Sequence, residues 1–370
     1  MQSNFPGISA ELSARLNKVA RAYVRVTGQC AFVELGQGNI NDTFLVDRGK
    51  NSFIIQRINA RVFREPRKVA QNTAVVSSHL NSNAAPAGFR FPRILQTRQG
   101  ENWYVDCNGE TWRAQSYIAG SRVYESIGDV ALASQVGRCL AAFHHGVENL
   151  PQDRLEQVLP GFHNLPLYLQ NFETALAGFS QKIRSKLHFC LECIARYGKY
   201  CDFFETAVSQ GNIAAKVVHG DPKVSNVLFD VSTEKAVAMI DLDTVGSGLV
   251  LYDIGDCLRS CCGPSEERNN SEVGFDTAMA AGVLEGYLQE RMLDRFELEH
   301  IYDALLLVSF ELGVRFVTDY LMGNQYFKVG LPEDNLNRAV VQFQLVENIA
   351  TQRRVIEGLV AGAEKQCQKR

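Results

Sequence analysis

The stretch from Val217 to Asp243, VVHGDPKVSNVLFDVSTEKAVAMIDLD, contains the pattern that decides how the rest of the chain is interpreted. A β-branched run ends just before Asp221, which is therefore expected in a loop directly after a strand. Asn226 precedes a second apolar run, and a third run ends in Asp241 and Asp243. This last run is predicted to be a strand that ends in Asp241-Leu242-Asp243, and alternation along it places the two carboxylates on one side. The pattern predicts that Asp221, Asn226 and Asp241 converge.

These side chains match the groups that phosphoryl transfer needs. Carboxylate and amide oxygens are the ligands that Mg²⁺ prefers, in small number, so that water and nucleotide phosphates complete its coordination. Asn226 and Asp241 are the predicted metal ligands, and Asp221 is the predicted catalytic base that accepts a hydroxyl proton. The alternative is a hairpin whose Asp and Asn residues only form turns. The occurrence of His, Asp, Asn and Asp in order, each at a strand boundary, favours the active site.

Composition limits the classes of protein to consider. A chain of 370 residues exceeds the usual single-domain size, so two lobes are expected. The formal net charge is −3 and Lys and Arg are scattered, which predicts no nucleic-acid and no membrane partner. The apolar stretch at 305–308 is interrupted by charges and is far shorter than a membrane span.

The ten cysteines show no disulfide framework. With no signal peptide evident at the first residues, this predicts a reduced protein in the cytoplasm. We expect a monomer or weak homo-oligomer.

Residues 1–117 are predicted to form a nucleotide-binding lobe. Apolar residues at helical spacing indicate an N-terminal helix around Leu12–Tyr23. Period-two patterns and turn residues predict a five-stranded antiparallel sheet with one helix, near 64–80, between its third and fourth strands. The strand segments are 31–35, 43–46, 52–58, 93–96, 103–105 and 111–117.

A glycine-containing loop links the first two predicted strands. Gly36 and Gly38 let the backbone approach a ligand closely, and successive amides there, up to Asn39 and Asn41, form an anion-binding concavity. When the loop is considered alone, a plain hairpin is the better explanation. Ahead of the Asp221 motif, it is expected to cover a nucleotide.

Residues 118–120 are predicted to be a hinge, and residues 121–370 a larger, mainly helical lobe that carries the catalytic loop. Two helices are expected within 167–209, and three helices near 276–290, 298–321 and 336–360 are expected to close the chain. The fold class is therefore α+β, with two lobes arranged as in protein kinases.

The motif H-G-D-x-x-x-x-N followed by I-D-L-D resembles the aminoglycoside phosphotransferase and choline kinase superfamily. Within it, the chain is similar to N-acetylhexosamine 1-kinases in segments spread over most of its length. The similar segments are 39–43 (NINDT), 53–59 (FIIQRIN), 160–164 (PGFHN), 217–243 and 311–321 (ELGVRFVTDYL).

The resemblance implies use of ATP with Mg²⁺ and phosphorylation of the C1 hydroxyl of a sugar, GlcNAc or GalNAc. It also implies that Arg315 and Tyr326 bind the sugar, as a fork of donors and an apolar face with one hydroxyl. A surface Arg and a packed Tyr are the alternative. Adenine is expected at the hinge, beside Tyr117 and Ile118.

The sequence departs from the kinase pattern on the third strand. Kinases commonly place a Lys there, paired with a Glu on the following helix, to hold phosphates. Here the strand offers Gln56 and Arg57, and the helix offers Gln71. We expect Gln56 or Arg57 to contact the nucleotide, although neighbours on a strand point to opposite faces.

Two other functions are compatible with these residues. The first keeps the fold and changes the acceptor to an aminoglycoside, choline or homoserine; Arg315, Lys328 and Arg338 near the expected pocket disfavour a cationic acceptor. The second is a pseudokinase that binds nucleotide without turnover, suggested by Gln56 and Gln71.

Overall fold

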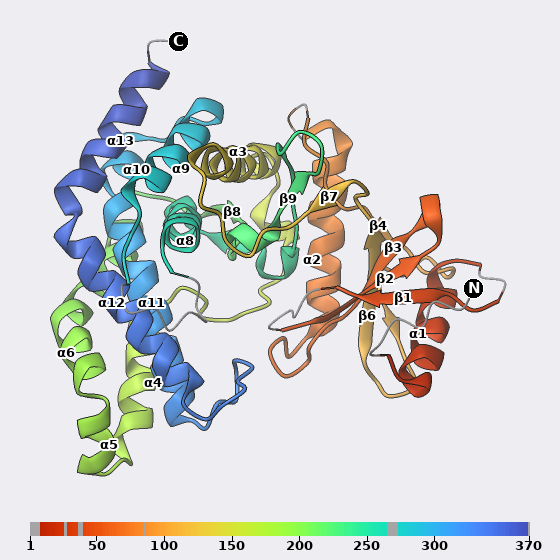
Figure 1. Cartoon of the computed structure of the whole chain (residues 1–370), viewed down its shortest axis with the longest axis horizontal. Coiled ribbons are helices and arrows are strands. Elements are labelled where there is room, and N and C mark those ends of the chain that lie inside the picture. Colours follow the sequence, from red (N-terminus) through yellow and green to blue (C-terminus); the bar gives the residue numbers. More distant parts are fainter. Residues whose placement is uncertain are drawn as a thin grey trace.

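The computed structural model describes residues 8–25, 28–35, 40–84, 86, 88–264 and 273–368. The chain forms two lobes, a smaller N-terminal lobe built on a sheet and a larger lobe that is mostly helical (Figure 1). Both lobes and their arrangement agree with the kinase-like fold predicted from the sequence.

The N-terminal lobe is an antiparallel sheet in the order β1-β2-β3-β6-β4, with β5 also paired to β6. All the strand segments expected from the sequence are present, but they make six strands and not five, because the two-residue strands β4 and β5 pair separately with β6. Its elements are α1 (Ala10–Tyr23), β1 (Ala31–Glu34), β2 (Asp42–Asp47), β3 (Phe53–Arg57), α2 (Pro66–His79), β4 (Ile94–Leu95), β5 (Tyr104–Val105) and β6 (Thr111–Ser116).

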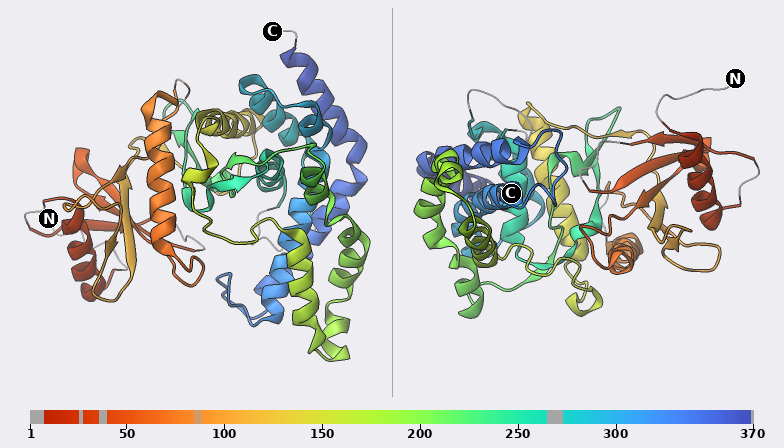
Figure 2. Two further views of the ribbon diagram at one scale, coloured as in Figure 1. Left: turned by 180° about the vertical axis from the view of Figure 1, so that it is seen from behind. Right: turned by 90° about the horizontal axis from the view of Figure 1, so that it is seen from below.

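The two faces of this sheet have different neighbours. Helix α1 packs Leu16 and Val19 against Phe44, Ile55 and Trp112 on one face, where all five side chains are buried. Burial of such large apolar groups is the main force that holds α1 on the sheet. The opposite face is turned toward α2, which runs between the sheet and the larger lobe (Figure 2).

The connection after β6 joins two sheets. Residues 117–120, the predicted hinge, lead directly into β7 (Ser121–Arg122), which pairs with β9 (Val227–Asp230) in the larger lobe. Gly120 has φ +72°, a backbone conformation that glycine adopts without strain, and its carbonyl accepts a hydrogen bond from Val231 N at 2.9 Å.

The larger lobe encloses one extensive apolar core between its helices. Helices α3 and α9 cross at such close range that an added Cβ at Gly137 would lie 2.0 Å from the carbonyl oxygen of Val283. The remaining elements are α3 (Val130–Val147), α4 (Leu165–Ala177), α5 (Gln181–Lys186), α6 (His188–Tyr197), α7 (Phe203–Ser209), β8 (Lys216–Val218), β10 (Ala236–Met239), β11 (Gly246–Gly248), α8 (Val250–Cys262), α9 (Thr277–Glu290), α10 (Arg295–Glu299), α11 (Ile301–Leu321), α12 (Asp334–Thr351) and α13 (Arg353–Cys367).

The helical segments are more divided than the sequence predicts. Residues 167–209 form α4 to α7 and not two helices, and the single helix expected over 336–360 is broken at Gln352. No proline or glycine marks that break, so local sequence gave no signal; the change of direction lets α13 pack against both α9 and α11. Across the part of the chain that the structure describes, no helix combines the length and apolarity that a membrane crossing requires.

Candidate active site

Asp253 on α8 fixes the backbone that precedes the predicted base. Its carboxylate accepts hydrogen bonds from His219 N at 2.6 Å and Gly220 N at 2.8 Å, and lies 2.9 Å from Nε2 of His144. Burial alone would raise the pKa of Asp253, but His144 and the Gly220 amide outweigh it and hold this pKa below its usual value. The loop that carries Asp221 is therefore anchored to the core of the larger lobe.

His219 links the catalytic loop to the segment that carries Asp241. Its ring Nε2 donates to the carbonyl oxygen of Ile240 at 3.0 Å, and its Nδ1 accepts from Asp221 N at 3.3 Å. Burial lowers the pKa of His219, which keeps the neutral ring that this bonding pattern requires. These contacts give His219 a structural role.

Asp221 lies in the loop after β8, as predicted, with a side chain that is 31% exposed. Lys223 Nζ donates to its Oδ2 at 2.8 Å, and Asn226 Nδ2 lies 3.2 Å from the same oxygen. Burial raises the pKa of Asp221, but Lys223, through its charge and its hydrogen bond, and the charge of Arg259 lower it by more, and the net shift is downward. The carboxylate is therefore ionised at neutral pH and able to accept a proton.

Asn226 and Asp241 meet at the open end of the β9–β10 hairpin. Val227 pairs with Met239, and Ile240 N donates to the carbonyl oxygen of Asn226 at 2.8 Å, so the next residue, Asp241, lies beside Asn226. The Nδ2 of Asn226 is bound to Asp221, through both its backbone oxygen and its Oδ2, which leaves Oδ1 for another partner.

The predicted route to this convergence needs one correction. Strand β10 ends at Met239, and Asp241 has φ 64° in the left-handed region, so strand alternation does not relate Asp241 to Asp243. Asp243 instead turns away from the metal position, toward Asn41 and Arg113 of the other lobe.

Asp241 has the character of a metal ligand. No donor group of the described residues contacts its carboxylate, and burial together with the charge of Asp243 raises its pKa to about 7 despite the opposing charges of Lys223 and Arg113. No cluster of three His, Cys, Asp or Glu side chains suited to a metal occurs within the described ranges. One carboxylate and one amide oxygen fit Mg²⁺, which retains water and binds through few protein ligands.

The residues predicted to bind the nucleotide separate into four groups. Gly36, Gly38 and Asn39 lie outside the described residues. Asn41 and Gln56 are buried at the side of the sheet that faces α2; Asn41 donates to Asp243, and Gln56 accepts from Arg113.

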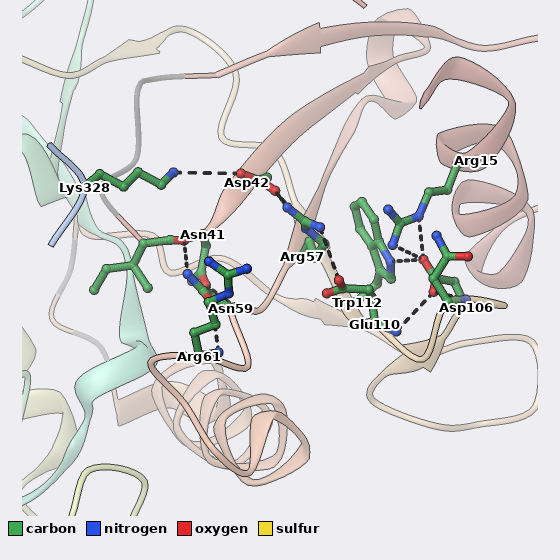
Figure 3. A network of polar contacts seen from close by, with 12 residues as sticks. Arg15, Asn41, Asp42, Arg57, Asn59, Arg61, Asp106, Glu110, Trp112 and Lys328 are labelled. Atoms are coloured by element: carbon green, nitrogen blue, oxygen red, sulfur yellow. Dashed lines mark hydrogen bonds and ion pairs between the residues drawn. The ribbon is translucent and has the colours of Figure 1, made fainter. Parts of the chain in front are cut away.

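Arg57 does not lie with Asn41 and Gln56. It lies on the opposite face of β3, where it pairs with Asp42 and, at 3.4 Å, with Glu110 (Figure 3). Lys328 of the larger lobe reaches across to Asp42, with Nζ 4.0 Å from Oδ1. Arg57 therefore belongs to an ion-pair network at the lobe boundary, and the prediction that it contacts a phosphate gains no support from its position.

The predicted adenine contacts flank the connection between the lobes. The Tyr117 side chain is 38% exposed and Ile118 is buried at 8%. The carbonyl oxygen of Ile118 accepts a hydrogen bond from the Ser121 hydroxyl at 2.6 Å. The position fits the prediction, and the contact with a purine stays a prediction.

Arg315 and Tyr326 come together beside the catalytic loop. The Arg315 guanidinium carbon lies 5.3 to 5.7 Å from the ring centres of Phe162, Tyr168, Tyr326 and Phe327. Burial alone would lower the pKa of Arg315, but nearby groups that include Tyr168, Tyr326, Glu311 and Asp221 raise it. The arginine is therefore a fixed cation within electrostatic reach of the predicted base.

The loop that carries Tyr326 is held by a single carboxylate. Asp319 accepts hydrogen bonds from the backbone amides of Gln325 at 2.8 Å, Tyr326 at 2.9 Å and Phe327 at 3.0 Å. Asn335 Nδ2 donates to the same carboxylate at 2.9 Å. The rings over Arg315 are thus positioned by the fold before any ligand binds.

Sequence reasoning missed Lys223, Asp253, Arg113 and the structural use of Asp243. Lys223 stands two residues from Asp221 and was identifiable as a charge beside the base. Arg113 is the cross-strand partner of Gln56, and only the pairing of β3 with β6 reveals it.

The two-lobe fold, with Asp221, Asn226 and Asp241 grouped in the larger lobe, defines a kinase-like phosphotransferase. The chain belongs to the phosphotransferase enzyme family (APH), whose model matches residues 31–298. It is a small-molecule phosphotransferase, as the sequence predicted, and the superfamily predicted from the motifs is confirmed.

Solved structures with the same fold include three kinases of low sequence identity. A microcompartment-associated aminopropanol kinase has a TM-score of 0.66 and 14% identity, with 92% of this chain and 98% of that chain covered. An amicoumacin kinase, solved with AMP-PNP, Ca²⁺ and Ami, has a TM-score of 0.59 and 17% identity over 94% and 95% of the two chains. A Plasmodium vivax ethanolamine kinase has a TM-score of 0.58 and 12% identity over 92% and 90%.

Proposed function

We propose that this phosphotransferase uses ATP with Mg²⁺ to phosphorylate the anomeric C1 hydroxyl of an N-acetylhexosamine. The observation that carries the proposal is the Arg315 cage, defined as Arg315 with the rings of Phe162, Tyr168, Tyr326 and Phe327, beside Asp221. The amicoumacin kinase of the same fold binds an ATP analogue, which supports ATP as the donor.

Arg315 has donors available for a ligand. Its one carboxylate contact among the described residues is with Glu311, at 3.8 Å from NH1, which is longer than a hydrogen bond. A guanidinium offers five N–H groups in a planar fork, suited to sugar hydroxyls or an acetamide carbonyl. The aromatic rings around it provide apolar faces of the kind that pack against a sugar ring.

The charge of the cage bears on the class of acceptor. A buried guanidinium repels a cationic ligand, and the repulsion is strong where water is excluded. Aminoglycosides and amino alcohols carry ammonium groups, whereas an N-acetylhexosamine is neutral and rich in hydroxyls. The cage therefore supports a neutral acceptor.

The residues would share the chemistry as follows. Asp221, which is ionised, orients the acceptor hydroxyl and takes its proton, and Lys223 stabilises this carboxylate. Asn226 and Asp241 would hold Mg²⁺, which supplies positive charge against the oxygens of the transferred phosphoryl group. An anomeric hydroxyl is more acidic than an ordinary alcohol, so alignment by Asp221 contributes alongside its basicity.

One observation favours a second acceptor class. A cavity of about 490 Å³ adjoins the catalytic loop at Gly220 and is lined by Glu205, His163 and Tyr252. Oε2 of Glu205 is buried without a hydrogen-bond partner, and burial raises the pKa of this carboxyl. An acceptor with an ammonium group, such as an amino alcohol or aminoglycoside, would satisfy that oxygen.

The test is a screen for ADP release with hexoses, N-acetylhexosamines, amino alcohols and aminoglycosides, followed by phosphorus NMR of the product. Turnover with GlcNAc or GalNAc and a phosphate on C1 is the expected result. Phosphate on C6 or C3, or turnover with amines alone, contradicts the anomeric assignment. ATP binding without turnover on any acceptor identifies a pseudokinase.

Arg315→Lys tests the role of the cage. We expect the KM of the sugar to rise by at least about tenfold, because a point charge replaces the fork, while the KM of ATP changes little. Arg196→Lys is the matched control, since Arg196 is an exposed arginine paired with Glu347 outside the site. Equal effects of the two substitutions on sugar KM would remove Arg315 from the pocket.

A further inference from the structure

The side of the N-terminal sheet that faces α2 contains a polar ladder at the position where kinases place their phosphate-binding lysine. Gln56 on β3 pairs across the sheet with Thr43 on β2 and with Arg113 on β6. Its Nε2 donates to Thr43 Oγ1 at 3.0 Å, and its Oε1 accepts from Arg113 Nε at 3.0 Å and NH2 at 2.9 Å. Gln56 therefore serves to hold a guanidinium.

Arg113 connects this ladder to α2 and to the larger lobe. Its NH1 donates to Thr73 Oγ1 on α2 at 2.8 Å, and its NH2 forms an ion pair with Asp243, two residues after the predicted metal ligand Asp241. The Arg113 side chain is 1% exposed and that of Asp243 is 4% exposed. A charged pair this deeply buried must remain paired, since either charge alone would be left uncompensated.

Asp243 also accepts a hydrogen bond from a second residue of the N-terminal lobe. Asn41, which follows the predicted glycine loop, donates to Asp243 Oδ2, and its own Oδ1 accepts from Asn59 N at 2.9 Å. Two parts of the nucleotide-binding lobe, the strand β6 and the end of the glycine loop, are thus joined at one carboxylate beside the metal position.

The helix residue expected to face Gln56 does not do so. Gln71 accepts a hydrogen bond from Asn102 at 3.1 Å in an exposed position. Thr73, two residues further along α2, lies against Arg113 instead. The link between sheet, helix and metal loop that a Lys and a Glu make in kinases is made here by different residues.

We propose that Arg113 is the positioning residue of this phosphotransferase: through Asp243 it sets the loop that carries Asp241 against the sheet under which the nucleotide lies. The inference rests on the proposed use of ATP with Mg²⁺. Nε, NH1 and NH2 are all engaged by Gln56, Thr73 or Asp243, so Arg113 acts through these partners and not by direct contact with substrate.

The shape of the guanidinium supports this role, because its planar fork contacts Gln56, Thr73 and Asp243 at the same time. A lysine, with one point charge, reaches Asp243 without also holding Gln56 and Thr73 in a planar fork.

The experiment compares Arg113→Met, Arg113→Lys and Asp243→Asn with Arg15→Met as the matched control. Arg15 is also an arginine of the N-terminal lobe that pairs with a buried carboxylate, Asp106, but it lies on α1, which covers the other face of the sheet. Steady-state rates are measured while MgATP, free Mg²⁺ and acceptor are each varied, and thermal midpoints establish that every variant is folded.

Arg113→Met is expected to lower kcat/KM for MgATP by about 10²-fold, as displacement of a catalytic group does, and to raise the half-saturating Mg²⁺ concentration. The acceptor KM should stay within about threefold, Arg113→Lys should recover part of the loss, and Arg15→Met should resemble the wild type. Because the pair acts as a unit, the double variant with Asp243→Asn should lose little more than Arg113→Met alone.

Three outcomes overturn the inference: near wild-type kinetics in folded Arg113→Met, additive effects in the double variant, or a loss confined to acceptor KM. If Arg113→Met does not fold, Asp243→Asn decides, because it keeps the shape of the side chain. Absence of phosphoryl transfer in the wild type refutes the proposed function instead, so the two failures are distinguishable.

Discussion

The amide Nδ2 of Asn226 lies 3.2 Å from Oδ2 of Asp221, so the predicted metal ligand also holds the predicted base. The two ends of the amide group have different partners. Its nitrogen is directed at Asp221, and its oxygen is available to a cation. In the predicted site, Asn226 therefore sets the position of the predicted base relative to the predicted metal.

Asn226→Ala is expected to raise the half-saturating Mg²⁺ concentration by about 10- to 100-fold, the range typical of lost support at a metal site. It should also lower kcat, since Asp221 loses a hydrogen bond that orients it. Rates measured over a Mg²⁺ titration at saturating ATP check both effects. An unchanged Mg²⁺ dependence would assign the metal to other residues.

Asp221→Asn is expected to lower kcat by about 10²- to 10⁴-fold, because the amide cannot accept a proton from the acceptor. The thermal midpoint should change little, since the substitution is isosteric and the side chain is partly exposed. Asp230→Asn is the control: Asp230 is a turn carboxylate at the end of β9, bonded to Ser232 and Thr233. A near wild-type rate in Asp221→Asn excludes it as the base.

His163 and Glu311 should make stability depend on pH. Nδ1 of His163 lies 3.1 Å from Glu311 Oε1. Burial and the charge of Arg315 lower the pKa of His163, but Glu311 and Asp256 raise it by more, so the folded value lies above the unfolded value of about 6.5. The stabilisation from the contact between His163 and Glu311 is therefore complete below a pH of about 6.5. It is lost as the pH rises through the pKa that His163 has in the folded protein.

The measurement is the free energy of unfolding in urea for the wild type and for His163→Gln, from about pH 6 to about pH 9. The stability difference between the two proteins should shrink as the pH rises. His188→Gln is the control, since the His188 side chain is 75% exposed and 3.4 Å from Glu192, and its difference should stay flat. If the stability difference between the wild type and His163→Gln grows with pH, the upward direction of the His163 pKa shift is wrong.

Gly137→Ala should destabilise the larger lobe by at least about 2 kcal/mol, because overpacking at a close helix crossing forces the backbones apart. The added Cβ would lie 2.0 Å from Val283 O and 2.9 Å from Tyr287 N. Gly358→Ala on the exposed side of α13 meets nothing within 4 Å and should be neutral or stabilising by about 0.5 to 1 kcal/mol. The measurement is the free energy of unfolding of both variants by chemical denaturation. Gly358→Ala reports the effect of helix propensity alone, and Gly137→Ala adds the effect of overpacking.

The sequence by itself was enough to predict the two lobes, the strand segments of the N-terminal sheet, and the candidate site residues Asp221, Asn226 and Asp241. These follow from patterns within a few residues of one another: period-two runs, turn residues, and polar groups at strand ends. The family model confirms the class of enzyme that they predicted.

Only the tertiary structure decided which groups meet across long separations in the chain. Arg113 and Asp243 are 130 positions apart, and their contact depends on how β6, α2 and the β9–β10 hairpin pack. The left-handed turn at Asp241 and the break at Gln352 likewise follow from packing, with no glycine or proline to signal them. Local sequence limits each residue to a few conformations, and burial and charge pairing between distant segments select among them.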